Sequence, residues 1–498
     1  IYDMRLVQEK VSRIAHVCQI RLAVFSPGHV PRAEVEARLS RLVAAYRQFS
    51  LASGNGLRAC PLDLGRRDMR DLVILPPVRG TPILNTRELA GLWHLPQATA
   101  DVPLVERTTA RQRLPLPFSV AQGCRIGASS HQGKTVPVSL PDEVLNRHLL
   151  LVAKTRRGKS SLLLRIAQHA MEARSPGKQP PALMLVDPHR DLARAALGLV
   201  PRSRRDDVVF LDASERDRPF GLNLLDVGLG WDRDKAVSNA LAIFRREFGV
   251  FWGPRMEDSF RFALLTLYEA NQSICREPDG RRRQHTVLEV PALLLNPVLR
   301  QSVQKRVADP IIHAWWKGYF EQLDRRLMIE IVNPIQTKVQ RYAGAYAARS
   351  IVGQPRSTID PGLWLRSGSI VIVNTSKGTV GEDTSALLGA TLLNLVALTV
   401  GEQAALDPSQ RCPVTIIVDE FHTMPGADYE GILAELAKYG ANLILATQSL
   451  TRLDALDREQ NRALRAMVFA NLDGLFAFHT SAEDAEYLVR ELGGEVDE

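Results

Sequence analysis

Basic and hydroxyl side chains follow a short apolar run near residue 150, in an order that suits phosphate binding. Residues 149–152 are predicted to form a buried strand, residues 153–158 a turn, and Lys159 the start of a helix. The backbone N–H groups of such a turn, together with the positive end of the helix, surround a phosphate group. We therefore expect Lys159 to reach the β- and γ-phosphate oxygens of a nucleotide and the Ser160 hydroxyl to bind Mg²⁺.

This predicted phosphate-binding loop departs from the pattern G-x-x-x-x-G-K-[ST]. Ala153 takes the first glycine position, and Arg156 and Arg157 are bulky. Alanine is tolerated there if its φ is negative, whereas a left-handed conformation would cost it about 1 kcal/mol or more. A basic turn that binds no nucleotide is the alternative for this segment alone. The expected nucleotide contacts are Ala153, Lys154, Thr155, Arg156, Arg157, Gly158, Lys159, Ser160 and Ser161.

Two later apolar runs also end in polar side chains. Asp419 and Glu420 follow residues 415–418, and Gln448 follows an apolar run about 25 residues later. Because the carboxyl ends of parallel strands meet at one edge of a sheet, these runs would deliver their polar residues to the same place as the loop. By itself, a strand that ends in two acids is also a common start of a solvated loop.

The three segments together predict a site for ATP and Mg²⁺. Asp419 is expected to hold Mg²⁺ with Ser160, and Glu420 to orient and deprotonate the attacking water. The neutral amide of Gln448 is suited to sensing the γ-phosphate without adding charge. The predicted catalytic residues are Glu420, Lys159 and Gln448, and the predicted metal ligands are Ser160 and Asp419.

Short apolar runs that alternate with helical patterns predict an α/β fold with a mostly parallel, doubly wound sheet. The second run ends at Asp187, which we expect beside the first strand and close to the phosphates. His189 is expected to be a hydrogen-bonded loop residue, since no second His or Cys lies at metal-ligand spacing. The predicted strands are 149–152, 182–186, 207–211, 369–374, 414–418, 443–447 and 475–478.

The chain is predicted to have four parts. Residues 1–120 form a small N-terminal α+β domain and a linker, for which assembly or docking is the expected role because no catalytic pattern occurs there. Residues 121–230 and 347–498 form the two parts of an ATPase core, and residues 231–346 an all-α insertion. Within the first part we expect strands at 21–25 and 72–75 and helices at 31–49 and 88–93; short β-prone pieces follow at 123–140.

Composition fits a large globular protein with an anionic partner. The 498 residues include 63 Lys and Arg against 55 Asp and Glu, a net charge of +8. The clusters Arg202/Arg204/Arg205 and Arg281/Arg282/Arg283 are either DNA contacts or solvated surface. Aromatic residues of the insertion either stack on bases or form core, and their helical spacing favours core: Trp252, Phe260, Phe262, Trp315, Trp316, Tyr319 and Phe320.

Cysteine usage and hydropathy exclude two classes of protein. The five cysteines are scattered and lack C-x-x-C spacing, so neither a disulfide framework nor a zinc site is supported. No apolar run reaches the roughly 18 residues that span a bilayer; the best candidate is an amphipathic stretch at 386–400. We expect a cytoplasmic protein that meets a membrane only through a missing terminus or a partner.

Eight short motifs over residues 120–498 resemble the HerA/FtsK superfamily of motor ATPases, and within it the coupling proteins of bacterial conjugative type IV secretion, the TraG/TraD group. The motifs are DPHRDL (187–192), FGLNLL (220–225), WGPRME (252–257), GQPRSTID (353–360), IVNTSKGTVGED (372–383), VDEFH (418–422), KYGANLILATQSL (438–450) and FAFHTSAEDAEYLV (476–489). The resemblance implies a RecA-like P-loop core and a hexameric ring that threads DNA, without sequence specificity, through its channel. The insertion matches the region that recognises the transferred DNA–protein complex, or relaxosome.

The sequence also departs from the family pattern. The family commonly has an arginine before KYG that acts in the neighbouring subunit's site, whereas this chain has Ala437 and Lys438. The candidates for that cation are Lys438, Arg326, Arg341 and Arg356. Family members typically carry N-terminal transmembrane helices, and none is recognisable here, so a soluble relative in mobile-element transfer or defence fits equally well.

The leading hypothesis is therefore an ATP-driven DNA translocase, or coupling ATPase. One alternative is a nucleotide-gated ring with little turnover that recruits an effector such as a nuclease. Another is an ATPase that moves protein substrates for secretion. DNA-stimulated hydrolysis favours the first, nucleotide binding without turnover the second, and DNA-independent hydrolysis the third.

Overall fold

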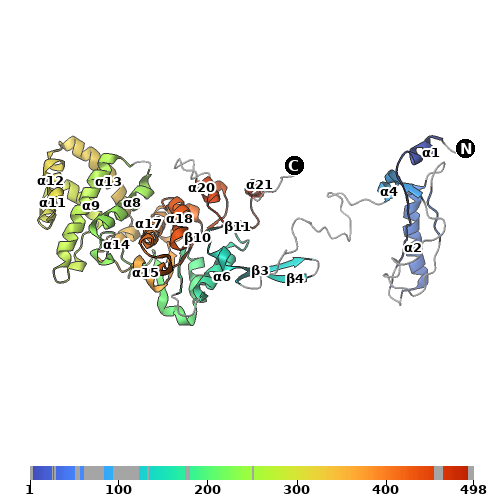
Figure 1. The fold of residues 1–498 in the computed structure, drawn as a ribbon, viewed down its shortest axis with the longest axis horizontal. Helices are drawn as coiled ribbons and strands as arrows, with labels where there is room; N and C mark the ends of the chain where they lie inside the picture. The colour runs from blue at the N-terminus through green and yellow to red at the C-terminus, as the bar shows by residue number, and fades with distance from the viewer. Residues whose placement is uncertain are drawn as a thin grey trace. The chain divides into compact units, whose positions relative to one another are not determined.

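The computed structural model describes residues 4–24, 26, 30–50, 56–60, 83–92, 123–131, 134–173, 180–249, 252–453 and 464–491. The chain divides into two compact units, Ile1–Thr109 and Ala110–Glu498, both drawn in Figure 1. The four-part division predicted from the sequence remains a proposal.

The first unit is a small α+β structure. Strand β1 (Ala15–Val17) pairs antiparallel with β2 (Ile83–Asn85), and the helices are α1 (Met4–Val11), α2 (Arg32–Tyr46) and α4 (Thr86–Leu92), with a 3₁₀ turn η1 (Arg47–Phe49) after α2. The helices predicted at 31–49 and 88–93 are thus confirmed.

The strand predicted at 21–25 is wrong over residues 21–24, which have no regular structure. A strand forms where a partner supplies hydrogen bonds, and here β2 pairs with residues 15–17 instead. The strand predicted at 72–75 lies outside the described residues.

The second unit is built on a parallel sheet of seven strands in the order β11-β5-β10-β9-β6-β8-β7. All seven strands predicted from the sequence are confirmed, and each neighbouring pair is parallel. The strands are β5 (Leu149–Val152), β6 (Ala182–Asp187), β7 (Val208–Asp212), β8 (Ile370–Asn374), β9 (Val414–Val418), β10 (Ala441–Thr447) and β11 (Gly474–Ala477).

Helices cover both faces of this sheet. Side chains alternate along each strand, so Leu149 and Leu151 enter one core with α6 (Lys159–Glu172) and α7 (Asp191–Leu199). Leu150 enters the other core, on the opposite face. The predicted doubly wound α/β fold is therefore confirmed. The β-prone pieces at 123–140 form a hairpin of β3 (Cys124–His131) and β4 (Lys134–Leu140).

Helix α17 (Glu382–Gly401) lies within the larger of these cores and contacts the helices on its far side. The amphipathic helix predicted at 386–400 is wrong, because α17 buries apolar side chains all around its circumference. Within the described residues, the stretch Glu382–Ala405 is apolar and long enough to cross a membrane, but 78% of its most apolar window is buried inside the protein. Such burial is typical of a central core helix.

Two polar side chains fix α17 to its neighbours. Asn394 donates to Gly426 O at 2.9 Å and accepts from Asp428 N at 2.8 Å. One turn earlier, Thr391 Oγ1 lies 2.8 Å from the hydroxyl of Tyr342. The helix is therefore bound both to the segment after β9 and to the helical region.

The described residues between 231 and 346 form helices and the loops between them, with no strand; they are drawn in green to yellow in Figure 1. Proline supplies the first residue of three of these helices, where no intrahelical N–H bond is lost. The helices of this region and its continuation are α8 (Arg233–Phe248), α9 (Pro254–Cys275), α10 (Val290–Leu295), α11 (Pro297–Gln304), α12 (Pro310–Gly318), α13 (Arg325–Gly344), α14 (Tyr346–Val352) and α15 (Pro361–Ser367).

Other helices and turns of the second unit are short. The α-helices are α5 (Asp142–Leu145), α16 (Lys377–Val380), α18 (Tyr429–Glu435), α20 (Leu464–Ala470) and α21 (Ala482–Glu491). The 3₁₀ turns are η2 (Arg202–Asp207), η3 (Val227–Leu229), η5 (Gly280–Arg282), η6 (Val287–Glu289), η7 (Phe320–Gln322), η8 (Glu402–Ala405), η9 (Pro408–Gln410), η10 (Phe421–Thr423) and η11 (Leu436–Tyr439).

The aromatic residues of the helical region pack mainly on one another, as their spacing predicts. Phe260, Trp316 and Phe320 are fully buried. Phe262 stacks on Trp315, with ring centroids 4.6 Å apart. These rings therefore build the core of the region rather than a surface for bases.

Arg204 is buried and structural, so neither interpretation of its arginine cluster holds for it. It is 1% exposed and donates to Met171 O at 3.2 Å, to Asp207 Oδ2 at 2.9 Å and to Gly368 O. Met171 lies near the end of α6 and Gly368 caps α15, so this guanidinium joins the ends of two helices.

We predict that Arg204→Ala lowers the free energy of unfolding by about 3 kcal/mol, because buried carbonyl acceptors lose a charged donor. Arg202→Ala, two residues away and exposed, is the matched control and should change it by less than about 0.5 kcal/mol. Urea denaturation measures both. Equal stabilities of the two variants would contradict a structural role for Arg204.

Candidate nucleotide-binding site

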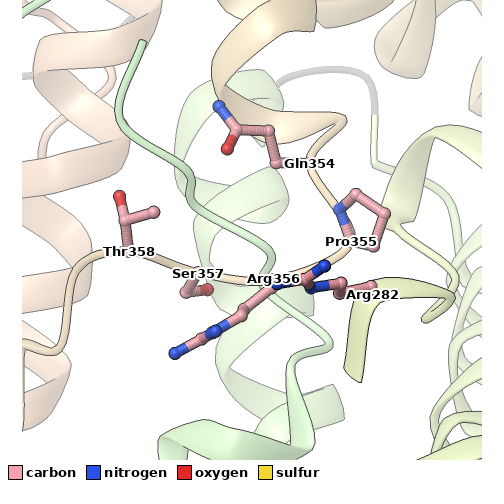
Figure 2. A pocket seen from close by; sticks show the side chains of 6 residues that line it. All are labelled: Arg282, Gln354, Pro355, Arg356, Ser357 and Thr358. Carbon is pink, nitrogen blue, oxygen red and sulfur yellow. The ribbon is translucent and has the colours of Figure 1, made fainter. Parts of the chain in front are cut away.

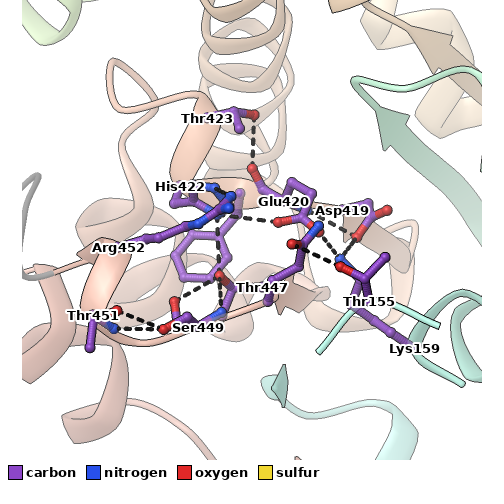
Figure 3. A network of polar contacts seen from close by, with 12 residues as sticks. Thr155, Lys159, Asp419, Glu420, His422, Thr423, Thr447, Ser449, Thr451 and Arg452 are labelled. Atoms are coloured by element: carbon purple, nitrogen blue, oxygen red, sulfur yellow. Dashed lines mark hydrogen bonds and ion pairs between the residues drawn. The ribbon is translucent and has the colours of Figure 1, made fainter. Parts of the chain in front are cut away.

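The order of three strands brings the predicted site residues together. Strand β10 lies between β5, which leads to Lys159, and β9, which leads to Asp419 and Glu420. All three strands are parallel, so their carboxyl ends share one edge of the sheet. Figure 3 shows the side chains that converge there.

The loop after β5 is held by backbone hydrogen bonds on both sides. Ala153 N donates to Thr447 O at 3.2 Å, and Lys154 N donates to His479 O at 3.0 Å. The φ angle is positive at Gly158 (100°) and at Arg156 (62°), but not at Ala153. Alanine therefore fits the first glycine position, and the backbone strain of this loop lies at Arg156.

Lys159 forms a buried ionic cluster with both predicted acids. Its Nζ lies 2.7 Å from Asp419 Oδ1 and also pairs with Glu420 Oε1. The three residues are 7%, 5% and 2% exposed, respectively. Burial raises the pKa of Asp419, and the Lys159 ammonium opposes this effect. Glu420 occupies a left-handed conformation, with φ of 46°, which aims its carboxylate back at Lys159.

A chain of hydrogen bonds connects Arg452 and His422, which lies next to Glu420, to the end of β10 (Figure 3). Arg452 Nη1 lies 3.0 Å from His422 Nε2. Arginine can only donate, so Nε2 accepts and the imidazole proton is on Nδ1. His422 Nδ1 then donates to Thr447 Oγ1 at 3.2 Å, with Glu420 Oε2 at 3.5 Å. Thr447 in turn donates to Ser449 O at 3.1 Å.

His422 is neutral in this arrangement. Burial, followed by the nearby cations Arg452, Lys159 and Lys377, lowers the pKa of His422 from 6.5 to about 4. A neutral imidazole next to Glu420 does not neutralise the carboxylate, which leaves the carboxylate available as a base.

The other predicted contacts lie around this cluster. Thr155 Oγ1 donates to Gln448 Oε1 at 3.2 Å, so the loop touches the predicted sensor amide directly. The turn residues 154–158 and both serines that follow Lys159 are exposed. The arrangement therefore presents a loop, two hydroxyls and an amide around a buried cation.

Asp187 does not lie where the sequence predicted. Strands β10 and β9 stand between β5 and β6, so the expectation that β6 lies beside β5 is wrong. The Asp187 carboxylate is fully buried and accepts from His189 N at 2.7 Å and Ala193 N at 2.9 Å. Burial raises its pKa. Asp187 therefore fixes the start of α7, and its contact with a nucleotide stays a prediction.

The side chains present fit Mg²⁺ and a nucleotide. Glu420 Oε2 is buried and makes no hydrogen bond. Mg²⁺ is usually held by one or two carboxylates together with substrate phosphates, which suits Asp419 and the hydroxyl of Ser160. Among the described residues, no group of three or more His, Cys, Asp or Glu side chains forms a metal cage.

Sequence reasoning missed two members of the site, His422 and Arg452. His422 is the last residue of the VDEFH motif, so it could have been found by asking what holds Glu420. Nothing in the spacing of Arg452 indicates its contact.

Comparisons with known proteins place the fold. No protein-family model and no curated protein matches this sequence. The bacterial conjugative coupling protein TrwBdeltaN70, in its unbound monoclinic form, has a TM-score of 0.50 at 14% identity, covering 74% of this chain and 76% of its own. This match shows that the chain shares the fold of that coupling protein.

Two further solved structures are similar. The plasmid coupling protein TrwB in complex with ADP and Mg²⁺ has a TM-score of 0.47 at 15% identity, covering 72% of this chain and 75% of its own. VirB4 of Thermoanaerobacter pseudethanolicus has a TM-score of 0.48 at 13% identity, covering 75% of this chain and 89% of its own.

We predict that Lys159→Ala destabilises the whole protein, because it leaves two buried carboxylates without their cation. Breaking a buried ion pair in this way costs about 3 kcal/mol or more. The triple variant Lys159→Met, Asp419→Asn, Glu420→Gln should recover most of this loss, since no charge remains buried. Thermal unfolding of the three proteins at neutral pH is the measurement, and equal stability of the single and triple variants would refute the cluster.

The lowered pKa of His422 predicts a specific dependence of stability on pH. Between about pH 6.5 and pH 4 the unfolded chain binds a proton that the folded chain does not, so His422 lowers the free energy of unfolding as the pH falls through this range. In His422→Asn this contribution is absent. Denaturation at several pH values should therefore show wild type losing stability relative to the variant below pH 6.5, and a constant difference would contradict the assignment.

Proposed function

We propose that this chain, whose fold is that of a conjugative coupling protein, is an ATP-driven DNA translocase of a conjugative, mobile-element or defence system. The observation that carries the proposal is the buried cluster of Lys159, Asp419 and Glu420 beside the amide of Gln448. Lys159 supplies a cation that binds phosphate, and Asp419 supplies a carboxylate that binds the metal. Glu420 supplies a base, and Gln448 a polar contact for the γ-phosphate.

Asp419 and Ser160 would hold Mg²⁺, and the loop 153–158 with Lys159 would hold the phosphates. Bound Mg·ATP supplies the phosphoanhydride bond and the positive charge that offsets its phosphates. Lys159 is paired with both carboxylates here. Phosphate oxygens would replace them as its partners, and this exchange would free Glu420.

The freed Glu420 would accept a proton from water. His422 Nδ1 lies 3.5 Å from the carboxylate, and Arg452 and Thr447 fix the imidazole. Gln448 lies at the next position after Thr447, so the end of β10 touches both His422 and the loop. A change at the γ-phosphate would therefore be felt by residues of β10 and β9 together.

The remaining parts of the proposal concern assembly and partners. The chain would act as a homo-oligomeric ring, most simply a hexamer, with DNA bound through phosphates rather than base sequence. Lys438, Arg326 and Arg341 are exposed and stay candidates for a cation that acts in the neighbouring subunit's site. The helical region would receive a relaxosome, secretion or effector protein, and the ring would work in the bacterial cytoplasm, at a membrane through its partners.

A second function, a nucleotide-gated ring that recruits an effector such as a nuclease, is favoured by one observation. Arg156 holds a left-handed conformation in the phosphate-binding loop, which costs a residue with a side chain about 1 kcal/mol or more. Hydrolysis measured with and without single- and double-stranded DNA distinguishes the functions. DNA-stimulated turnover supports the translocase, binding without turnover supports the gated ring, and turnover indifferent to DNA supports protein secretion.

We predict that Glu420→Gln lowers kcat for ATP hydrolysis about 100-fold or more, because the amide cannot accept the proton from water. Nucleotide affinity should change by less than about threefold, since the shape of the side chain is kept. Steady-state hydrolysis and fluorescent-nucleotide binding measure the two effects. Unchanged hydrolysis in this variant would remove Glu420 from its proposed role.

A further inference from the structure

A pocket of about 520 Å³ lies away from the nucleotide cluster and shares no residue with it. It is lined by residues 354–358, which connect α14 to α15, and by Arg282 at the end of η5. Figure 2 shows Arg282 and Arg356, which come from separate segments, among the side chains that line the pocket. The lining therefore includes two arginines.

A buried hydrogen-bond network holds the loop that carries Arg356. The carboxylate of Asp226, 1% exposed, accepts from Ser357 N at 2.7 Å. Asn223, which is fully buried, donates from Nδ2 to Pro355 O at 2.9 Å and accepts the Ser357 hydroxyl at its own carbonyl. Backbone atoms on both sides of Arg356 are thus fixed, so its side chain extends from a rigid support.

Two of the three arginines in the run 281–283 form ion pairs within the protein, and the middle one does not. Arg281 pairs with Asp226 at 3.4 Å, and Arg283 pairs with Glu277 at 2.8 Å. The side chain of Arg282, between them, has no hydrogen-bond or ion-pair partner within the described ranges. Only the middle charge of this run is therefore left for an external ligand.

Arg356 is exposed and likewise has no such partner in the described part of the chain. Two unneutralised guanidinium groups that line one pocket create a positive potential that an anion relieves. Their planar N–H donors match the oxygens of a phosphate. Thr358 Oγ1 accepts from Gly221 N at 2.8 Å, which leaves its own proton for another acceptor. We propose that Arg282 and Arg356 form a binding site for a phosphate of the nucleic-acid backbone.

An exposed aromatic ring at the other end of α14 favours nucleic acid as the source of that phosphate. Tyr346 is 56% exposed, and the guanidinium carbons of Arg216 and Arg349 each lie 6.0 Å from its ring centroid. Aromatic rings among cations are the usual platforms for the bases of single strands. Helix α14, which lies between this ring and the pocket loop, has seven residues, or about 10 Å.

This inference rests on the proposed DNA function, and the same chemistry has one other source. A nucleotide bound to a neighbouring copy of the chain also presents phosphates, and Arg356 was a sequence candidate for a cation acting there. If the phosphate belongs to nucleic acid, loss of the arginines weakens binding of an oligonucleotide. If it belongs to the nucleotide of a neighbouring copy, loss of the arginines weakens binding of ATP.

The test is binding of a labelled single-stranded oligonucleotide by the full chain, measured by fluorescence anisotropy at several salt concentrations. Arg282→Ala and Arg356→Ala should each weaken binding about fivefold and reduce the slope of log affinity against log salt by about 0.7. Arg283→Ala removes the same charge from the same run but should leave the slope unchanged, because that charge is paired with Glu277. Tyr346→Leu should weaken binding without changing the slope, since it removes stacking and no charge.

Wild-type slopes in both pocket variants, with unchanged ATP affinity, would overturn the proposal. Wild-type slopes with weakened ATP binding would assign the phosphate to the nucleotide of a neighbouring copy. If wild type binds no oligonucleotide even at low salt, the DNA translocase itself fails. Calorimetric titration with inorganic pyrophosphate then tests the pocket by itself. Binding of two pyrophosphate ions per wild-type chain and one per Arg356→Ala chain would support the pocket. Equal numbers of bound ions in the two proteins would refute it.

Discussion

The parallel pairing of β10 with β5 on one side and β9 on the other is the constraint on which this molecule depends. Thr447 lies opposite Val152, and Leu445 opposite Val418. All three strands are buried, so a slip of one residue would exchange the side chains that face the two cores. Backbone hydrogen bonds between distant segments therefore set where Lys159 meets its carboxylates.

The charges at that meeting point do not balance. One ammonium faces two carboxylates in a buried position, and His422 adds no charge because its pKa is about 4. The excess charge is negative. Burial raises the pKa of Asp419. A divalent cation is the kind of ligand that such an excess attracts. The edge of the sheet thus carries a negative charge that its proposed ligand, Mg²⁺, would neutralise.

Much of the fold was predictable because each central strand is buried on both faces and reads as a continuous apolar run, such as residues 149–152. The Lys159, Asp419 and Gln448 segments were found because each ends such a run. Strand order was not predictable from the chain, since pairing is non-local, and Asp187 was therefore misplaced. The contacts of Arg452 were missed for the same reason, because they are fixed only by tertiary packing.

Helix α17 gives the molecule a mechanical property. Asn394 holds the segment that follows Glu420, and Thr391 holds Tyr342 of α13. One apolar core also runs without interruption from the sheet to the helical region. Close-packed interiors are stiff and transmit strain. The helical region is consequently not a separate module, because a displacement at the acidic edge of the sheet would be transmitted to it through this shared core.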